Sequence, residues 1–279
     1  MEAAVVWRVW RRLLREPVLR EAVLGGRLDE LAAALGLDAP EIEVARAYAE
    51  HPAGTEMFVH SYRFRMVSSF FNALETVAPL THRALLANDV GLREIAVDLL
   101  DRREWVDAGP FVYAFGSQIL DHLAADKALG EITGLPELIA LERAAADVVI
   151  EAAAGRPAAE DQDSAVGHWR VRAPFGIHTC DRDLSEWLRD SRTLGLSVPS
   201  AASKHYLIFL PTPDTDRRIV AVPRRACDIL RILKDRPAEL SLLAEELAQR
   251  GHPAAPARDR AILDRFEALG LVAAPVGGS

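Results

Sequence analysis

Apolar residues in the first 154 positions recur at spacings of three and four, which is typical of amphipathic helices. A first helix over 6–14 is expected to stop at Pro17, and a second is expected to end at Gly25-Gly26. Asp38 is placed to cap one later helix, and Asn88-Asp89 to cap another. The remaining predicted helices cover residues 29–35, 40–50, 56–77, 91–100, 111–124 and 136–154.

The longest of these predicted helices, 56–77, carries an apolar stripe along one face. The members of the stripe are Phe58, Tyr62, Met66, Phe70, Ala73, Leu74 and Val77. A stripe of this kind predicts a helix face that packs against other helices. The predicted helix 136–154 repeats the pattern with Leu138, Leu141, Ala145 and Val149.

The pattern changes after residue 154. Residues 155–167 are small, polar and acidic and are expected to form a linker. Alternation over 168–172 predicts a strand, and 183–190 predicts one or two helical turns. Runs of β-branched and aromatic residues predict strands at 204–210 and 217–222, joined by a hairpin connection at 211–216. Three helices are then expected over 225–234, 239–250 and 257–269, with Gly251 and Gly270 as stops.

These patterns predict a mostly α protein with a smaller α+β part. We expect an N-terminal helical domain over 1–154, the linker over 155–167, and a second domain over 168–279. The second domain is predicted to be a winged-helix-like module, in which a β-hairpin or small antiparallel sheet precedes three helices.

Composition narrows the class of protein. Half of the 279 residues are apolar, which excludes a wholly disordered chain, and two cysteines cannot form a disulfide framework. The longest stretch without Asp, Glu, Lys or Arg is 108–120, too short to span a bilayer. The start of the chain does not resemble a signal peptide, because charges interrupt its apolar run. We therefore expect a soluble cytoplasmic protein without a membrane partner.

Charge is distributed unevenly along the chain. Residues 1–200 hold 21 Lys and Arg against 31 Asp and Glu, whereas 201–279 hold 12 against 10. The formal net charge of −8 therefore combines an acidic helical part with a slightly basic C-terminal module. An acidic balance overall argues against nucleic acid as the main partner.

Catalytic and metal-binding signals are weak. No nucleotide-binding, zinc-protease or serine-hydrolase motif occurs in the sequence. His168, His178 and Cys180 are the closest group of potential metal ligands, near Asp181 and Asp183, but no second ligand pair accompanies them. We therefore expect no metal and no cofactor in this chain.

Other reactive side chains have simple structural interpretations. Cys227 lies among apolar residues in helical register and is expected to be a core residue rather than a nucleophile. Glu75, Glu142 and Asp147 could form a carboxylate pair, but charges on amphipathic helices usually face solvent. The chain itself is therefore not expected to be an enzyme.

Three segments between residues 56 and 150 carry a resemblance. They contain Tyr62-Arg63, Ala73-Leu74, Pro79 and Leu85-Leu86, then 115–123, then 135–142 with Leu138, Leu141 and Glu142. Together they resemble a bacterial helical domain, often labelled a putative DNA-binding domain, in partner proteins of multinuclear non-haem iron oxidases of the methanobactin type. Ala78 stands where that family usually has Phe. The resemblance implies a helical domain that docks on an oxidase, with the iron in the oxidase.

Residues 203–274 resemble a second family, the recognition element of ribosomally made and post-translationally modified peptides (RiPPs). This small domain, similar to the pyrroloquinoline-quinone peptide chaperone, captures the leader of a precursor peptide. The resemblance implies that the leader adds a strand to the hairpin edge and lies against the last helix. The implied peptide-binding residues are Ile219, Val220, Ala221, Val222, Arg258, Ile262, Arg265 and Phe266. Ile262 and Phe266 could equally be core residues of the module.

The two resemblances predict a non-catalytic partner in RiPP biosynthesis. It would form a heterodimer with the oxidase, bind an acidic and apolar leader peptide, and deliver the precursor for post-translational modification. A winged-helix transcription regulator is the alternative, because Arg258, Arg260 and Arg265 could contact phosphates. This alternative is weakened because a DNA-binding winged helix normally has a two-stranded wing after this helix, whereas here the segment after it is residues 273–279. A structural scaffold without peptide specificity is a third possibility.

Overall fold

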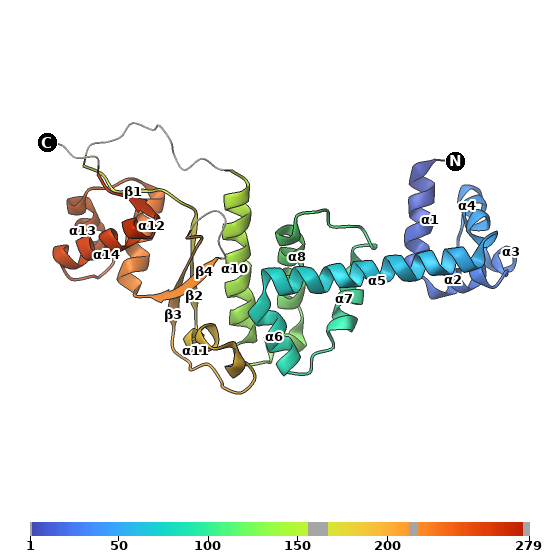
Figure 1. The fold of residues 1–279 in the computed structure, drawn as a ribbon, viewed down its shortest axis with the longest axis horizontal. Coiled ribbons are helices and arrows are strands. Elements are labelled where there is room, and N and C mark those ends of the chain that lie inside the picture. The colour runs from blue at the N-terminus through green and yellow to red at the C-terminus, as the bar shows by residue number, and fades with distance from the viewer. Residues whose placement is uncertain (1, 156–166, 212–216, 276–279) are drawn as a thin grey trace. The chain divides into compact units, whose positions relative to one another are not determined.

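The computed structural model in Figure 1 describes residues 2–155, 167–211 and 217–275. The chain forms two compact units. The first unit contains the residues up to Thr76 together with Asp89–Phe115, and the second contains Val77–Asn88 with the chain from Gly116 onward. The predicted division into domains 1–154 and 168–279 stays a prediction. Positions 156–166 of the predicted linker and 212–216 of the predicted hairpin connection lie outside the described residues.

The first unit is helical. Its elements are α1 (Ala3–Arg15), α2 (Pro17–Leu24), α3 (Leu28–Leu31), α4 (Ala39–Ala49), nearly all of α5 (Pro52–Val77) and α7 (Leu92–Arg102). Pro17 separates α1 from α2, and the backbone N–H groups of Asp38 and Glu41 exchange hydrogen bonds with each other's side chains in a capping box. The predicted cap at Asp38 is therefore confirmed.

The second unit begins with a group of helices, one of which packs against a face of the sheet. They are α6 (Pro79–Ala87), most of α8 (Val112–Ala124), α9 (Lys127–Gly130), α10 (Leu135–Ala153) and α11 (Ser185–Arg189), with a 3₁₀ turn η1 (Ser191–Thr193). Helix α10 packs on the sheet at Gly176, where an added Cβ would lie 2.9 Å from the Val148 side chain. Only glycine leaves room for this close approach.

The three-stranded sheet is antiparallel. Its strands β2 (Phe175–Cys180), β3 (Lys204–Phe209) and β4 (Arg218–Val222) lie in the order β2-β3-β4. Phe175 pairs with Phe209, and Leu207 pairs with Val220. A separate two-stranded sheet joins β1 (Arg170–Val171) to β5 (Val272–Ala273). Strand β4 is therefore an edge strand.

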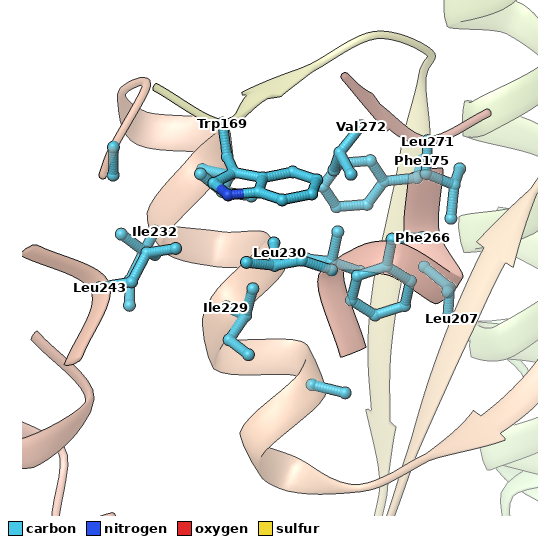
Figure 2. Packing of buried hydrophobic residues seen from close by; sticks show 14 of the residues in the cluster. Trp169, Phe175, Leu207, Ile229, Leu230, Ile232, Leu243, Phe266, Leu271 and Val272 are labelled. Carbon is cyan, nitrogen blue, oxygen red and sulfur yellow. The ribbon is translucent and has the colours of Figure 1, made fainter. Parts of the chain in front are cut away.

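Three helices follow the sheet and close its second face. They are α12 (Arg224–Asp235), α13 (Leu240–Gln249) and α14 (Pro256–Ala268). Side chains from all three meet β2 and β3 in a buried core, and Figure 2 shows Trp169, Leu230 and Phe266 within it. Gly251 and Gly270, each with a positive φ, follow α13 and α14 as predicted. The protein is thus mostly helical, with a small antiparallel sheet followed by helices, and the predicted fold class is confirmed.

Several local predictions are wrong. Asn88 does not cap α7, whose N-cap is Gly91; the Asn88 side chain donates to the carbonyl of Ala84 at the end of α6. Strand β2 was not predicted, because Gly176 and His178 give it the composition of a loop. The predicted strand over 168–172 is only the two-residue β1. Phe58 belongs to the predicted buried stripe of α5, yet 64% of its surface is exposed.

Candidate peptide-binding groove

Strand β4 presents one unpaired edge. Its partner β3 pairs with every residue from Arg218 to Val222, and no strand of the described chain pairs with the opposite edge. Val220 and Ala221 are exposed, with 37% of the Val220 surface open. Outward backbone N–H and C=O groups on such an edge can accept an additional strand.

Helix α14 lies beside this edge and offers a mixed face. Arg258, Ile262, Arg265, Phe266 and Leu269 recur at helical spacing on and just beyond the helix. Arg258 and Arg265 are exposed, Ile262 is half-buried, and Phe266 is 4% exposed. Phe266 belongs to the buried core (Figure 2) and also lines the space beside β4.

Between β4 and α14 runs a groove of about 450 Å³, called here the β4–α14 groove. Its lining residues are Leu207, Phe209, Pro211, Arg218, Val220, Ala221, Val222, Pro223, Ala226, Arg258, Ile262, Arg265, Phe266 and Leu269. Seven of the eight residues named from the sequence thus lie together in one groove. Ile219 is the one that does not line it.

Sequence reasoning missed part of the lining. Leu207 and Phe209 supply the apolar floor, and they could have been found only from the register, which places Leu207 opposite Val220 and Phe209 opposite Arg218. Arg218 was missed although it immediately precedes the four edge residues. Its position next to the predicted edge was the available signal.

Three arginines, Arg218, Arg258 and Arg265, line the groove and give it positive charge, and none of the described residues that line it is acidic. Asp214 and Asp216, which precede Arg218 in the chain, lie outside the described residues. Within the described parts of the chain, no ion pair or side-chain hydrogen bond engages these three guanidinium groups. The groove therefore combines an apolar floor, free backbone groups and three available cations.

A buried ion pair fixes the helix wall of the groove. Arg225 of α12 donates to Asp259 of α14, with 2.7 Å between Nη2 and Oδ2, and its Nη1 donates to the carbonyl of Pro253 at 2.8 Å. Both charged side chains are nearly inaccessible to solvent. The pair holds the first turn of α14 against the first turn of α12.

Asp228 is the centre of a second charge cluster on α12. His252 lies 2.8 Å from one carboxylate oxygen, and Arg231 donates to the other at 3.1 Å. Burial raises the pKa of Asp228, but the hydrogen bonds from His252 and Arg231 outweigh burial, and the net pKa is lowered. This cluster ties α12 to the turn after α13, and nothing in the sequence pattern indicated it.

The potential metal ligands do not converge. His178 is on β2 opposite Tyr206, Cys180 is opposite Lys204 at the end of that strand, and His168 lies 3.8 Å from Glu239 before α13. Burial raises the pKa of the Cys180 thiol to about 12, so it is protonated at neutral pH. Across the described ranges, no group of three His, Cys, Asp or Glu residues is arranged to hold a metal ion.

The core prediction for Cys227 is confirmed, whereas the prediction for Glu142 is wrong. Cys227 is completely buried, and burial raises its thiol pKa to about 11, which confirms the core interpretation. Glu142 was expected on a solvated face, and that expectation is wrong: only 1% of the residue is exposed. Its carboxylate accepts hydrogen bonds from the N–H groups of Leu80 and Thr81, so Glu142 caps the start of α6.

The arginines of the DNA-binding alternative are not equivalent. Arg260 pairs with Asp264 at 2.8 Å and lies 5.1 Å from the ring of Trp169. Arg258 and Arg265, in contrast, face the β4–α14 groove. Only two of the three are therefore available on this face.

Over the part of the chain that the structure describes, none of the helices has the length and hydropathy needed to cross a membrane. No model of a known protein family matches the chain, and no curated protein matches it.

Proposed function

We propose that this protein binds the leader of a ribosomally made precursor peptide in the β4–α14 groove and delivers the precursor to a multinuclear non-haem iron oxidase. The observation that carries the proposal is the groove itself. It joins a strand edge and three arginines, none of them paired by any residue that the structure describes, to an apolar floor. The iron and the oxidative chemistry belong to the partner enzyme.

The unpaired edge supports binding of an extended peptide. A peptide strand beside β4 would satisfy the outward backbone groups, and this gives affinity that does not depend on sequence. Alternate side chains of the added strand would point toward α14, because residues i and i+2 of a strand share one face. Those side chains would meet Val220, Ile262 and Phe266.

The charge of the groove supports an acidic leader. Carboxylates next to the apolar anchors would meet Arg218, Arg258 and Arg265, which have no acidic neighbour in the groove. Complementary charge raises the association rate and discriminates against basic peptides. An apolar sequence with interspersed Asp or Glu is therefore the ligand that fits best.

Delivery follows from holding both partners at once. When the leader is bound to this chain and the chain is bound to the oxidase, the modifiable part of the precursor is tethered close to the iron. Tethering raises its effective concentration to the millimolar range, about the value for short flexible linkers.

The direct experiment uses the full chain, the oxidase and the precursor peptide, co-expressed and purified together. A ternary complex is expected, with fluorescent leader peptide bound by the isolated chain. The Val220→Glu variant should lose peptide binding while the matched Val198→Glu variant, at a site 73% exposed and outside the groove, should keep it. Sequence-specific binding of duplex DNA in place of the peptide would establish the regulator alternative instead.

A further inference from the structure

The first unit exposes aromatic side chains around a second cavity, called here the aromatic hollow. It has a volume of about 540 Å³ and is formed by α1, α4 and α5. The residues that matter for its chemistry are Trp7, Trp10, Tyr48, Phe58, Tyr62 and Arg65. All of them belong to the first unit, so the hollow is separate from the β4–α14 groove.

Trp10 is the centre of the hollow. It is 7% exposed, and its ring centroid lies 5.8 Å from Tyr48, 6.2 Å from Phe58 and 5.7 Å from Tyr62. Trp7 and Phe58 line it with 54% and 64% of their surfaces exposed. Large aromatic side chains on a buried aromatic base resemble the hot spots of protein interfaces, which are enriched in Trp, Tyr and Arg.

Charge restricts what the hollow can accept. Arg65 lies 5.1 Å from the ring of Tyr62, and no acidic residue lines the hollow. Among the described residues, no carboxylate pairs with the Arg65 guanidinium. The aromatic rings favour an apolar group, and a carboxylate beside that group would complement the charge of Arg65.

Another cavity adjoins the hollow. Trp7 and Tyr62 also line a neighbouring cavity of about 840 Å³, beside a row of arginines on α1. Those arginines are already neutralised: Arg8, for example, lies 2.9 Å from Glu41. Among these arginines and Arg65, Arg65 is therefore the one without a carboxylate partner among the described residues. Trp7 and Tyr62 line both cavities and so connect them.

We infer that the aromatic hollow is a docking site for a partner protein that inserts a bulky apolar side chain flanked by carboxylates. In the proposed complex this partner is the oxidase. The choice of the oxidase rests on the proposed function. The peptide would then bind to the second unit, and the enzyme would bind to the hollow of the first unit.

The test measures the affinity of the purified full chain for the purified oxidase by calorimetry, and for fluorescent leader peptide by anisotropy. Phe58→Glu should weaken oxidase binding by about thirtyfold or more, and Arg65→Glu by about tenfold. The matched control is Phe64→Glu on the same helix, 74% exposed and outside the hollow, which should change affinity by less than about threefold. Peptide affinity should stay unchanged in all three variants.

Each contrary result has a distinct meaning. Full oxidase affinity in Phe58→Glu, or an equal loss in Phe64→Glu, overturns the hollow as the docking site and leaves the proposed function intact. A wild-type chain that binds peptide but never oxidase overturns both. Dimerisation of the wild-type chain in sedimentation, abolished by Phe58→Glu, would assign the hollow to a second copy and overturn the inference.

Discussion

Arg225 and Asp259 form a buried ion pair between α12 and α14, with 2.7 Å between Nη2 and Oδ2. Each residue is next in the chain to a residue that lines the β4–α14 groove: Arg225 precedes Ala226, and Asp259 follows Arg258. The pair therefore sets the position of the helix wall against which a peptide would lie.

Replacing Asp259 with Ala should destabilise the protein strongly. The substitution leaves the Arg225 guanidinium buried without its carboxylate, and breaking a buried pair in this way costs about 3–5 kcal/mol in the free energy of unfolding. Urea denaturation measures the loss. The control is Asp264→Ala, which removes an exposed pair with Arg260 on the same helix and should cost about 1 kcal/mol or less. Equal losses would show that the buried pair does not determine the stability of this module.

Reversing the charge of Arg265 should weaken peptide binding. Arg265→Glu places a carboxylate beside the acidic leader, and we expect a loss of about tenfold at low salt, with a smaller loss at high ionic strength because salt screens exposed charges. Fluorescence anisotropy with a labelled leader measures it. Arg192→Glu, exposed and outside the groove, should leave the affinity unchanged. A loss that does not depend on salt would argue against an electrostatic role for Arg265.

Addition of a peptide strand should protect alternate amides of β4 from hydrogen exchange. Successive N–H groups of an edge strand point alternately toward its partner and away from it. Only the N–H groups that face away from β3 are open in the free protein, so every second amide between Arg218 and Val222 should slow when peptide is added. Residue-resolved NMR exchange measures this. Uniform protection, or none, would contradict strand addition.

The helices and the hairpin strands were predicted from the sequence for a physical reason, and seven of the fourteen residues that line the groove were named in advance. Each of these depends on local periodicity: Ile262 and Phe266 share a helix face, and Val220 lies in a β-branched run. The eight peptide-binding residues were implied by the resemblance to a RiPP recognition element, and local patterns placed them on one strand and one helix face; seven of them line the groove.

What the sequence could not predict depends on contacts between distant segments. Gly176 and His178 are typical of a loop in composition, and the strand that contains them is explained only by the packing of α10 on β2. Leu207 lies in the groove only because it pairs with Val220. Glu142 lies on a helix that otherwise exposes its charges, and its buried role depends on the N-terminus of α6, more than sixty residues earlier. Periodicity carries no information about such pairings.

Neutralising Glu142 should destabilise the second unit. In Glu142→Gln an amide replaces the carboxylate that accepts hydrogen bonds from the N–H groups of Leu80 and Thr81. One of these N–H groups would then face the amide NH2, which is also a donor, and the other would keep an acceptor that carries no charge. We expect a loss of about 1–3 kcal/mol in the free energy of unfolding. The control is Asp147→Asn, an exposed change on the same helix, which should stay within about 0.5 kcal/mol. A neutral effect of Glu142→Gln would contradict a role for the carboxylate charge at the start of α6.

Acidification should destabilise the sheet through His178. Burial lowers the pKa of this imidazole, so the folded protein takes up the proton at lower pH than the unfolded chain does. The stability that His178 contributes is therefore fully present above about pH 6.5, the unfolded value, and is lost as the pH falls through the lower folded value. Urea midpoints should fall between pH 7.5 and 5, and the fall should be smaller in His178→Gln, which keeps a neutral polar side chain. His60→Gln, at an exposed position on α5, is the control and should retain the wild-type slope. An identical slope in His178→Gln would assign the acid sensitivity to other groups. His205 is the next residue to substitute, because burial and the charge of Arg231 also lower its pKa.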